Sequence, residues 1–465
     1  MLRFFRINDP YRLLIGFVLL VLFSLPLFID PVSATILEIK TSILGELISG
    51  GKFMYIEVVD DTAPLASAIY GLMDLVGGRS LMFHRIIGLL LVFFQAAYFS
   101  IVLINYKAYV EKTYVFVLVF LVLALFSFDI IMLSPELMAS TFLLFTINSI
   151  FKEVEFKIQR DETILSMGAY IGIASLLVFS FSLFLFISLF ILIAFARINF
   201  RKVLLLIYGF VLPHLMLATL YFFWGELTPL WKYYYSSNIT LDTTSFLSIK
   251  AVFIIGSIPL FYLLMSLHRV NREARLTKYQ SQLMQIMLLW IVFCLVHLLV
   301  VREFSARSFI PLLPGLAYFI TSYFLLIRRK WIAEIMIWIF MVGILSTSYL
   351  ARYNKFSGVD YSLNFSMSSN YKDRFQAKRI VVLGEDWSLY QQNIPAMGLI
   401  NWNLSQFIFS DPNNENLLII RSAFDAELPE IIVDESNRLG SFLNRMPDIK
   451  SKYKREGVLY IKSSN

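Results

Sequence analysis

The stretch EIKTSILGELISGGKFMYIEVVDDTAPLASAIYGLMDLVGGRSLMFHR, residues 38–85, decides how this chain is organised. It separates two strongly apolar runs, and at about fifty residues it is much longer than the usual connection between helices. It has helical periodicity, aromatic residues and six carboxylates. A connection of this length and composition is typical of a structured, functional loop.

The composition indicates a membrane protein with many spans. Of the 465 residues, 58% are hydrophobic and only 16% are charged, whereas a soluble domain is about 45–50% apolar and about 25% charged. Apolar runs of about 17–22 residues recur along the chain, long enough to cross a bilayer. The single cysteine, Cys294, rules out a disulfide framework. The net charge of +7 follows the loops and does not indicate a nucleic-acid partner.

Eleven membrane spans are predicted from these runs. They cover residues 13–29, 86–104, 114–128, 137–151, 164–180, 183–196, 203–223, 247–267, 283–301, 309–327 and 331–350. The region 164–196 is too long for one ordinary span and short for two, so it is either a tight hairpin or one long tilted helix. The expected fold is a polytopic α-helical membrane protein.

The distribution of lysine and arginine predicts the orientation. Eighteen of them fall in short loops at 3–12, 107–112, 152–160, 197–202, 269–278 and 328–330, against about eight in the opposite short loops. Positive loops face the cytoplasm. We therefore expect an inner-membrane protein with a cytoplasmic N-terminus, a first extracytoplasmic loop at 30–85 and an extracytoplasmic C-terminus. Only the hairpin reading of 164–196 keeps the later basic loops inside.

The composition changes after the last predicted span. Residues 352–465 are polar, with β-like runs at 379–383, 417–420, 430–433 and 458–461 and helix-like spacing at 439–445. This pattern predicts a small α/β domain with a partly parallel sheet. The chain therefore divides into a transmembrane domain, 1–351, and a soluble domain, 352–465. The soluble domain shows no GxGxxG or P-loop pattern.

Two helices are predicted inside the first loop. Residues 38–47 place Ile39, Ile43, Leu44 and Leu47 at helical spacing, which predicts an amphipathic helix on the membrane surface. A second helix is expected to begin near Pro64, with Asp61 or Thr62 as its N-cap.

The adjacent carboxylates of Asp60 and Asp61 are the candidates for chemistry. Capping is an alternative role for Asp61 but explains Asp60 less well. Asp60, Glu57 or an earlier glutamate is a candidate general base or metal ligand, so a divalent cation is a candidate cofactor. Two neighbouring carboxylates near a low-dielectric surface repel each other, which raises one pKa toward neutrality.

The segment GGKFMYIEVVDDTAPL, followed by Arg85 at the second span, resembles the first loop of the GT-C superfamily, in its protein O-mannosyltransferase and aminoarabinose transferase branch. That loop often reads Gly-x-x-Tyr and then Pro-Pro-Leu, which Tyr55 and residues 63–65 match in part. Other pieces also resemble the branch: an acid between spans three and four, glycines in span five, and arginines before a Pro-Leu-Leu-Pro helix start. They are Asp129, Glu136, Gly168, Gly172, Arg302, Arg307 and residues 311–314. The early acid pair of the branch is reduced here to Glu38.

The resemblance implies a GT-C-like glycosyltransferase that takes a sugar from a polyprenyl-phosphate lipid and works on the outer face of the cytoplasmic membrane. The acceptor would be a glycan, lipid or protein. The implied catalytic acids are Asp60, Asp61, Glu57 and Glu38. The implied substrate-binding residues are Arg302, Arg307, Arg85, Asp129, Glu136 and Tyr55, with Arg79 as a further phosphate-binding candidate. The alternative is a non-catalytic GT-C-like scaffold or lipid-binding protein of an envelope assembly.

Overall fold

The computed structural model describes residues 1–30, 33–156, 161–240, 244–353, 355–356, 358–365 and 375–463. Two of the basic loop residues counted above, Lys157 and Arg160, lie outside these ranges. The chain forms two compact units. One comprises Met1–Pro31, Met82–Leu217 and Leu241–Leu363, and the other comprises Val32–Leu81, Ala218–Thr240 and Asn364–Asn465.

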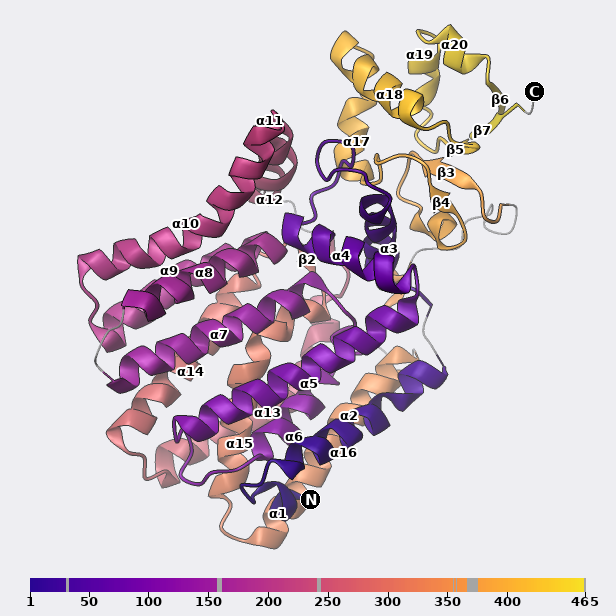
Figure 1. The fold of residues 1–465 in the computed structure, drawn as a ribbon. Helices are drawn as coiled ribbons and strands as arrows, with labels where there is room; N and C mark the ends of the chain where they lie inside the picture. Colours follow the sequence, from indigo (N-terminus) through magenta and orange to yellow (C-terminus); the bar gives the residue numbers. More distant parts are fainter. Residues whose placement is uncertain are drawn as a thin grey trace. The chain divides into compact units, whose positions relative to one another are not determined.

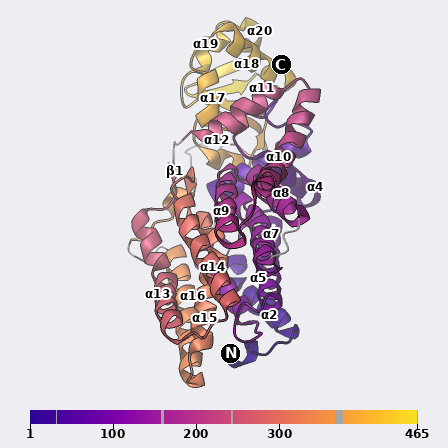
Figure 2. The same cartoon turned by 90° about the vertical axis from the view of Figure 1, so that its left-hand side faces the viewer.

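The first unit is a bundle of long apolar helices that run side by side (Figures 1 and 2). Its helices are α1 (Leu2–Phe5), α2 (Tyr11–Ile29), α5 (Leu81–Asn105), α6 (Val115–Ala124), α7 (Pro135–Phe156), α8 (Asp161–Leu177), η1 (Phe179–Ser182), α9 (Leu183–Ile191), η2 (Leu192–Ala196), α10 (Phe200–Phe223), α13 (Ile249–Glu273), α14 (Lys278–His297), η4 (Ala306–Leu312), α15 (Leu313–Leu326), α16 (Lys330–Arg352) and η5 (Ser362–Asn364). The short strands β1 (Thr244–Ser245) and β2 (Glu303–Phe304) pair in parallel.

Within the described residues, nine helices are long and apolar enough to cross a membrane. The other two predicted spans coincide with α6 and α8, which are 10 and 17 residues long. The prediction of a polytopic helical membrane protein is confirmed. The count of eleven crossings stays a prediction.

The region 164–196 forms the predicted hairpin. Extended backbone at Val178 separates α8 from η1 and α9. The chain then returns to the level of its start, because Arg201, in the first turn of α10, donates to Asp161 at the start of α8, with 2.9 Å between Nη2 and Oδ2. Gly168 lets α8 approach α10 closely: a Cβ there would lie 2.2 Å from the carbonyl oxygen of Leu206.

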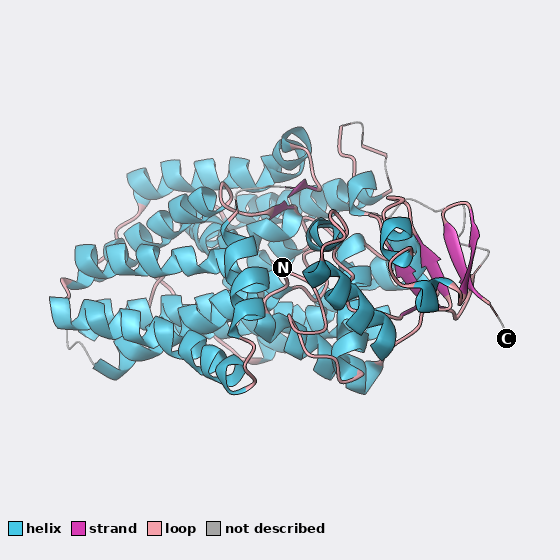
Figure 3. Ribbon diagram, turned by 90° about the horizontal axis from the view of Figure 1, so that it is seen from above, coloured by secondary structure: helices cyan, strands magenta, loops and turns pink. Residues whose placement is uncertain are grey.

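The second unit combines the first loop, the segment 218–240 and the C-terminal sheet. Its elements are α3 (Ile36–Ser49), α4 (Pro64–Gly77), α11 (Leu227–Leu230), η3 (Trp231–Ser236), α12 (Ser237–Ile239), β3 (Arg379–Val382), η6 (Trp387–Gln391), β4 (Ile394–Pro395), α17 (Trp402–Ile408), α18 (Asn414–Ala426), β5 (Ile431–Val433), α19 (Leu439–Leu443), α20 (Pro447–Lys450), β6 (Tyr453–Glu456) and β7 (Leu459–Lys462). The strand order is β4-β3-β5-β7-β6. The strands gather into one small sheet in Figure 3.

The predicted partly parallel sheet is confirmed, since β3 pairs in parallel with β4 and β5, while β7 pairs antiparallel with β5 and β6. One predicted strand is wrong. Residues 417–420 lie inside helix α18, because Asn413 caps the helix by accepting from the Asn416 backbone N–H. Burial of Ile420 and Phe424, four residues apart, then anchors one helical face. The division of the chain at residues 351 and 352 stays a prediction.

The helix predicted at 38–47 is present as α3, but its environment differs from the prediction. The four residues of its predicted apolar stripe, Ile39, Ile43, Leu44 and Leu47, are buried in protein, and Ile43 and Leu44 are fully covered. Helix α4 covers them, and the two helices pack closely where Gly45 meets the Tyr70 carbonyl. The exposed apolar side chains of this pair lie on α4 instead, at Leu72, Leu75 and Val76.

Candidate functional site

The acidic turn, residues 60–62, lies in the second unit and precedes helix α4. Asp60 is fully buried, and both of its carboxylate oxygens accept hydrogen bonds. Its Oδ2 accepts from the hydroxyl and the backbone N–H of Thr62, the latter at 3.3 Å. Asp61 keeps 16% of its side chain exposed. Of the two acids, Asp61 therefore has the surface with which to contact a substrate.

Neither Asp61 nor Thr62 caps the following helix. Helix α4 begins at Pro64, its N-cap is Ala63, and no side chain caps it. The N-cap prediction is wrong because the Asp61 carboxylate is engaged elsewhere. The fixed φ of Pro64 at the first helical position starts the helix without a cap.

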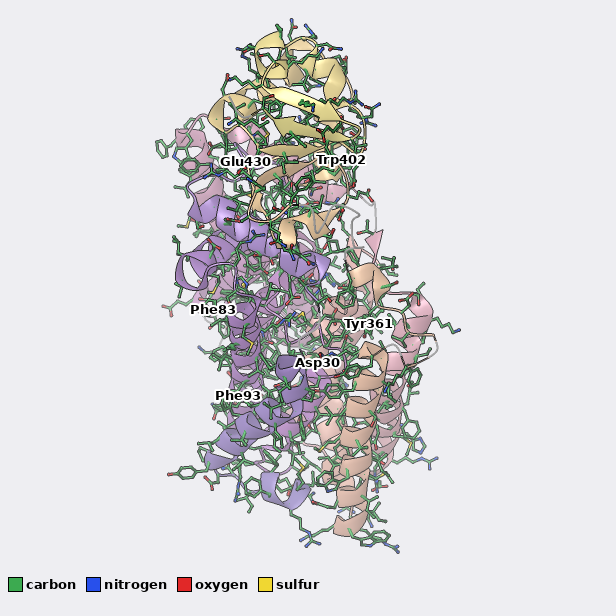
Figure 4. All side chains as sticks on the ribbon, turned by 90° about the vertical axis from the view of Figure 1, so that its right-hand side faces the viewer. Asp30, Phe83, Phe93, Tyr361, Trp402 and Glu430 are labelled. Carbon is green, nitrogen blue, oxygen red and sulfur yellow. The ribbon has the colours of Figure 1, made fainter. Side chains whose placement is uncertain are left out.

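A lysine and an asparagine connect the two carboxylates. The Lys40 Nζ lies 3.2 Å from Asp60 Oδ1 and 3.3 Å from Asp61 Oδ1. The Asn401 Nδ2 donates to the same two oxygens, at 2.7 and 3.0 Å. Lys40 comes from α3, and Asn401 directly precedes Trp402, the first residue of α17, which Figure 4 labels. Segments about 340 residues apart thus meet at one acid pair.

Burial raises the pKa of Asp60 above its ordinary value of 3.8. The Lys40 ammonium lowers this pKa, the neighbouring Asp61 raises it, and the hydrogen bonds from Thr62 and Asn401 lower it. Burial outweighs the lowering effects because a fully covered carboxylate loses its hydration. Burial thus favours the protonated form of Asp60 relative to an exposed aspartate.

Tyr55 holds the acidic turn through a hydrogen bond to Thr62. Its hydroxyl donates to the Thr62 carbonyl at 2.5 Å, and its backbone adopts φ +66°, a conformation uncommon for a residue with a side chain. Its ring stacks on Tyr234, with 6.1 Å between centroids. Burial raises the pKa of Tyr55 well above its ordinary value, so its hydroxyl stays protonated as a donor. Asn238 completes the turn by donating to the Asp61 carbonyl at 3.0 Å.

The other two predicted acids have local structural roles. Glu38 is buried and forms a capping box with Thr35 at the start of α3, each side chain accepting from the other's backbone. Glu57 is exposed, and its carboxylate accepts from the Phe53 backbone N–H at 2.8 Å. Their catalytic assignment stays a prediction.

Two basic residues join the first loop to the C-terminal sheet. Arg79 donates to the carbonyls of Tyr390 and Asn393 at 2.6 and 2.7 Å, and it lies 3.4 Å from a Glu46 oxygen. Lys52 pairs with Glu427 at 3.0 Å. The Arg79 guanidinium is therefore engaged with protein oxygens.

The remaining predicted residues lie in the first unit. Arg85 on α5 is buried one turn before Gly88, where a Cβ would lie 2.4 Å from the Ile131 carbonyl. This close approach places the start of α5 beside the loop that carries Asp129. Asp129 is buried and accepts from Ser127, whose hydroxyl lies 2.9 Å from that of Tyr361 (labelled in Figure 4).

Glu136 and Arg307 lie on two elements that pack together, α7 and η4. The Glu136 Oε2 is buried and has no hydrogen-bond partner among the described residues. Arg307 is only 6% exposed, and its one described hydrogen bond runs from Nε to Ser305 at 3.3 Å. No carboxylate pairs with Arg307 within the part of the chain that the structure describes. Arg302 precedes β2, and its carbonyl accepts from the Thr244 N–H at 2.7 Å.

Across the described ranges, no group of three or more histidine, cysteine, aspartate or glutamate side chains is arranged to hold a metal ion. Asp60 and Asp61 bring two carboxylates together, but Lys40 occupies the position between them. A metal ion there would have to displace the ammonium, so this pair as folded fits the lysine better than a metal ion.

Sequence reasoning missed three residues that hold the acidic turn: Lys40, Asn238 and Asn401. Lys40 could have been noticed as the one basic residue within the otherwise apolar and acidic helix at 38–47. Asn238 and Asn401 left no local signal, since a neutral amide in a polar segment looks like any loop asparagine.

Comparisons with known proteins find similar structures but no similar sequences. No family model matches the sequence, and no curated protein matches it significantly. The structure is similar to that of ArnT from Cupriavidus metallidurans bound to undecaprenyl phosphate, with a TM-score of 0.52, 9% identity, and coverage of 91% of this chain and 92% of that one. Archaeal oligosaccharyltransferase AglB from Archaeoglobus fulgidus, in complex with an inhibitory peptide and a dolichol-phosphate, gives a TM-score of 0.47, 10% identity, and coverage of 98% and 74%.

The chain therefore has the fold of the GT-C membrane glycosyltransferases and is a multi-pass membrane protein. The ArnT likeness extends over nearly the whole of both chains. At 9% identity this likeness shows the fold alone.

Proposed function

We propose that this protein is a membrane glycosyltransferase that moves a sugar from a polyprenyl-phosphate lipid to an acceptor on the outer face of the cytoplasmic membrane. The GT-C fold supports the class of protein, and the distribution of basic loops supports the face of the membrane. The observation that carries the proposal is Arg307, a buried cation without a carboxylate partner among the described residues.

A buried, unpaired guanidinium is costly unless an anion completes it. Arginine forms paired, charge-assisted hydrogen bonds with phosphate, and Arg307 stands at the start of the helical segment η4–α15. A lipid phosphate bound there would satisfy the charge. As the sugar leaves, the same guanidinium would stabilise the charge that returns to that phosphate.

The reaction requires one proton transfer. The acceptor oxygen forms a bond to the anomeric carbon of the sugar, the bond from that carbon to the phosphate oxygen breaks, and the acceptor proton goes to a carboxylate. We assign this carboxylate to the pair formed by Asp60 and Asp61, with Asp61 as the member that contacts the acceptor because it retains exposed surface. Asp60, which is buried, would set the pKa of Asp61 through its neighbouring charge.

A second function, a non-catalytic lipid-binding scaffold, is favoured by one observation. Both Asp60 oxygens are engaged within the protein, and Glu38 serves as a helix cap. Carboxylates whose oxygens already accept hydrogen bonds from the protein suit a structural role. The scaffold would keep the phosphate-binding arginine but would not need Asp61.

The test is binding of undecaprenyl phosphate to the purified protein in lipid nanodiscs, measured by native mass spectrometry. Arg307→Gln should weaken binding about 10- to 100-fold, the effect of losing hydrogen bonds to a charged group. Arg201→Gln is the matched control, since this arginine is exposed and pairs with Asp161. Equal affinity in Arg307→Gln and wild type would refute the phosphate role.

Transfer then separates the two functions. Wild type is incubated with a panel of undecaprenyl-phosphate-linked sugars and membrane extracts as acceptor, and Asp61→Asn is compared with it. The enzyme proposal expects transfer by wild type and its loss in Asp61→Asn, with lipid binding unchanged. Binding without transfer of any sugar on the panel would favour the scaffold.

A further inference from the structure

We propose that Asn401, in the C-terminal sheet domain, is a positioning residue that sets the spacing and the protonation of the Asp60–Asp61 pair. This inference rests on the proposed function and assigns a task to the C-terminal domain within it. Every contact that supports it lies inside the second unit.

The first observation is the direction of the Asn401 side chain. Asn401 is the N-cap of α17, where asparagine normally accepts a hydrogen bond from a backbone N–H of its own helix. Here it makes no such side-chain cap. Its amide instead donates to Asp60 and Asp61, at 2.7 and 3.0 Å. An amide nitrogen carries two hydrogens, one for each carboxylate.

The second observation is that Asn401 is held rigidly. It is 6% exposed, and its carbonyl accepts from the backbone N–H groups of Leu404 and Ser405 at 3.2 and 2.8 Å. Three residues earlier, the Gly398 carbonyl accepts from the Val59 N–H at 2.8 Å. The segment 398–401 therefore runs along residues 59–61 with contacts at both ends, so the amide has a fixed position against the acids.

The third observation is the charge at the pair. Lys40 on α3 is the cation shared by the two carboxylates, and the Tyr55 hydroxyl faces them as a further titratable group. One ammonium is thus shared by two carboxyl groups. The amide supplies hydrogen bonds that favour the ionised forms without adding charge. Loss of the amide should therefore raise the pH at which the pair ionises.

The test uses the full-length protein and compares Asn401→Ala with Asn403→Ala, an exposed asparagine on the same helix. For the sugar that wild type transfers, we expect Asn401→Ala to shift the acid limb of the pH–rate profile upward by about half to one pH unit, with KM for the lipid donor unchanged. Asn401→Asp should shift it further because it adds a like charge. Asn403→Ala should match wild type.

A second readout does not depend on transfer. Hydrogen–deuterium exchange at the amides of Val59 and Thr62 should become at least about tenfold faster in Asn401→Ala, because the acidic turn loses its anchor. If wild type transfers no sugar, the proposed function fails, and this exchange measurement alone decides whether Asn401 positions the turn. Exchange and pH profile both equal to wild type would overturn the inference.

If Asn401→Ala proves too unstable to assay, Asn401→Ser replaces it, since serine retains one donor on a small side chain. An acid limb between those of wild type and Asn401→Asp is then expected. An unshifted limb in Asn401→Ser, together with wild-type exchange at Val59, would equally overturn the inference.

Discussion

Gly398→Ala is the substitution that most directly tests how the first loop is held. A Cβ at residue 398 would lie 2.0 Å from the carbonyl oxygen of Glu57 and 2.8 Å from its carbonyl carbon. Both are backbone atoms, so no side-chain rotation relieves the contact. Because carbon and oxygen approach no closer than about 3.3 Å, the two segments must move apart by about 1 Å.

The energetic cost has two parts. Forcing extra volume into a packed site costs about 1–3 kcal/mol. The separation also stretches the bond from the Val59 N–H to the Gly398 carbonyl, which is 2.8 Å now, at a cost of about 0.5–1.5 kcal/mol. Together these give about 1.5–4.5 kcal/mol against the docked arrangement, which is about a 10- to 2,000-fold increase in local opening.

Hydrogen–deuterium exchange by mass spectrometry on peptides covering 53–62 measures this opening. We expect faster exchange at Val59 by that factor, while peptides from α7 remain unchanged. Gly440→Ala is the matched control, because its Cβ would meet two side-chain ends at ordinary distances, the Tyr460 hydroxyl at 3.4 Å and the Arg455 guanidinium at 3.9 Å. Wild-type exchange at Val59 in Gly398→Ala would refute the described contact between 57–59 and 398.

Two further predictions concern charge and helix packing. Lys40→Met leaves Asp60 and Asp61 without their shared cation, so the folded-state pKa of Asp60 should rise further above 3.8. Since an acid with a raised folded-state pKa makes the protein less stable as the pH rises through that value, the free energy of unfolding should be close to wild type near pH 4 and lower by about 3 kcal/mol at pH 8. Lys454→Met, at a 76% exposed lysine, should match wild type at both pH values. Gly168→Ala should lower the melting temperature in detergent, because its Cβ would lie 2.2 Å from the Leu206 carbonyl oxygen and the clash costs about 1–3 kcal/mol. Gly256→Ala is the control and should not lower it, because open space surrounds that position. Similar melting temperatures for the two variants would contradict the close α8–α10 packing.

The sequence predicted what depends on local pattern. Apolar runs placed the membrane helices, and charge distribution selected the hairpin at 164–196, which the Asp161–Arg201 contact confirms. Three of four predicted strands overlap β3, β5 and β7. The fourth, 417–420, failed because four aliphatic residues in a row fit either a strand or one face of a helix, and Asn413 decided for the helix.

The candidate site was predictable only in part. Adjacent acids in a long loop drew attention to Asp60 and Asp61, and the resemblance pointed to Arg307; their roles stay predictions. The partners Lys40 and Asn401 could not be inferred, because no local pattern reports a contact between residues 60 and 401. For the same reason the burial of α3 was missed: its apolar stripe suits a bilayer as well as a neighbouring helix.

The pairing of residues 60 and 401 also has a consequence for synthesis. The first loop leaves the ribosome early, yet its acidic turn lacks one of its amide donors until about 340 more residues have been translated. A nascent or prematurely terminated polypeptide would therefore insert its helices into the bilayer while the turn remained incomplete. Maturation of this turn would therefore wait for synthesis of the segment around residue 401, which contributes the missing amide.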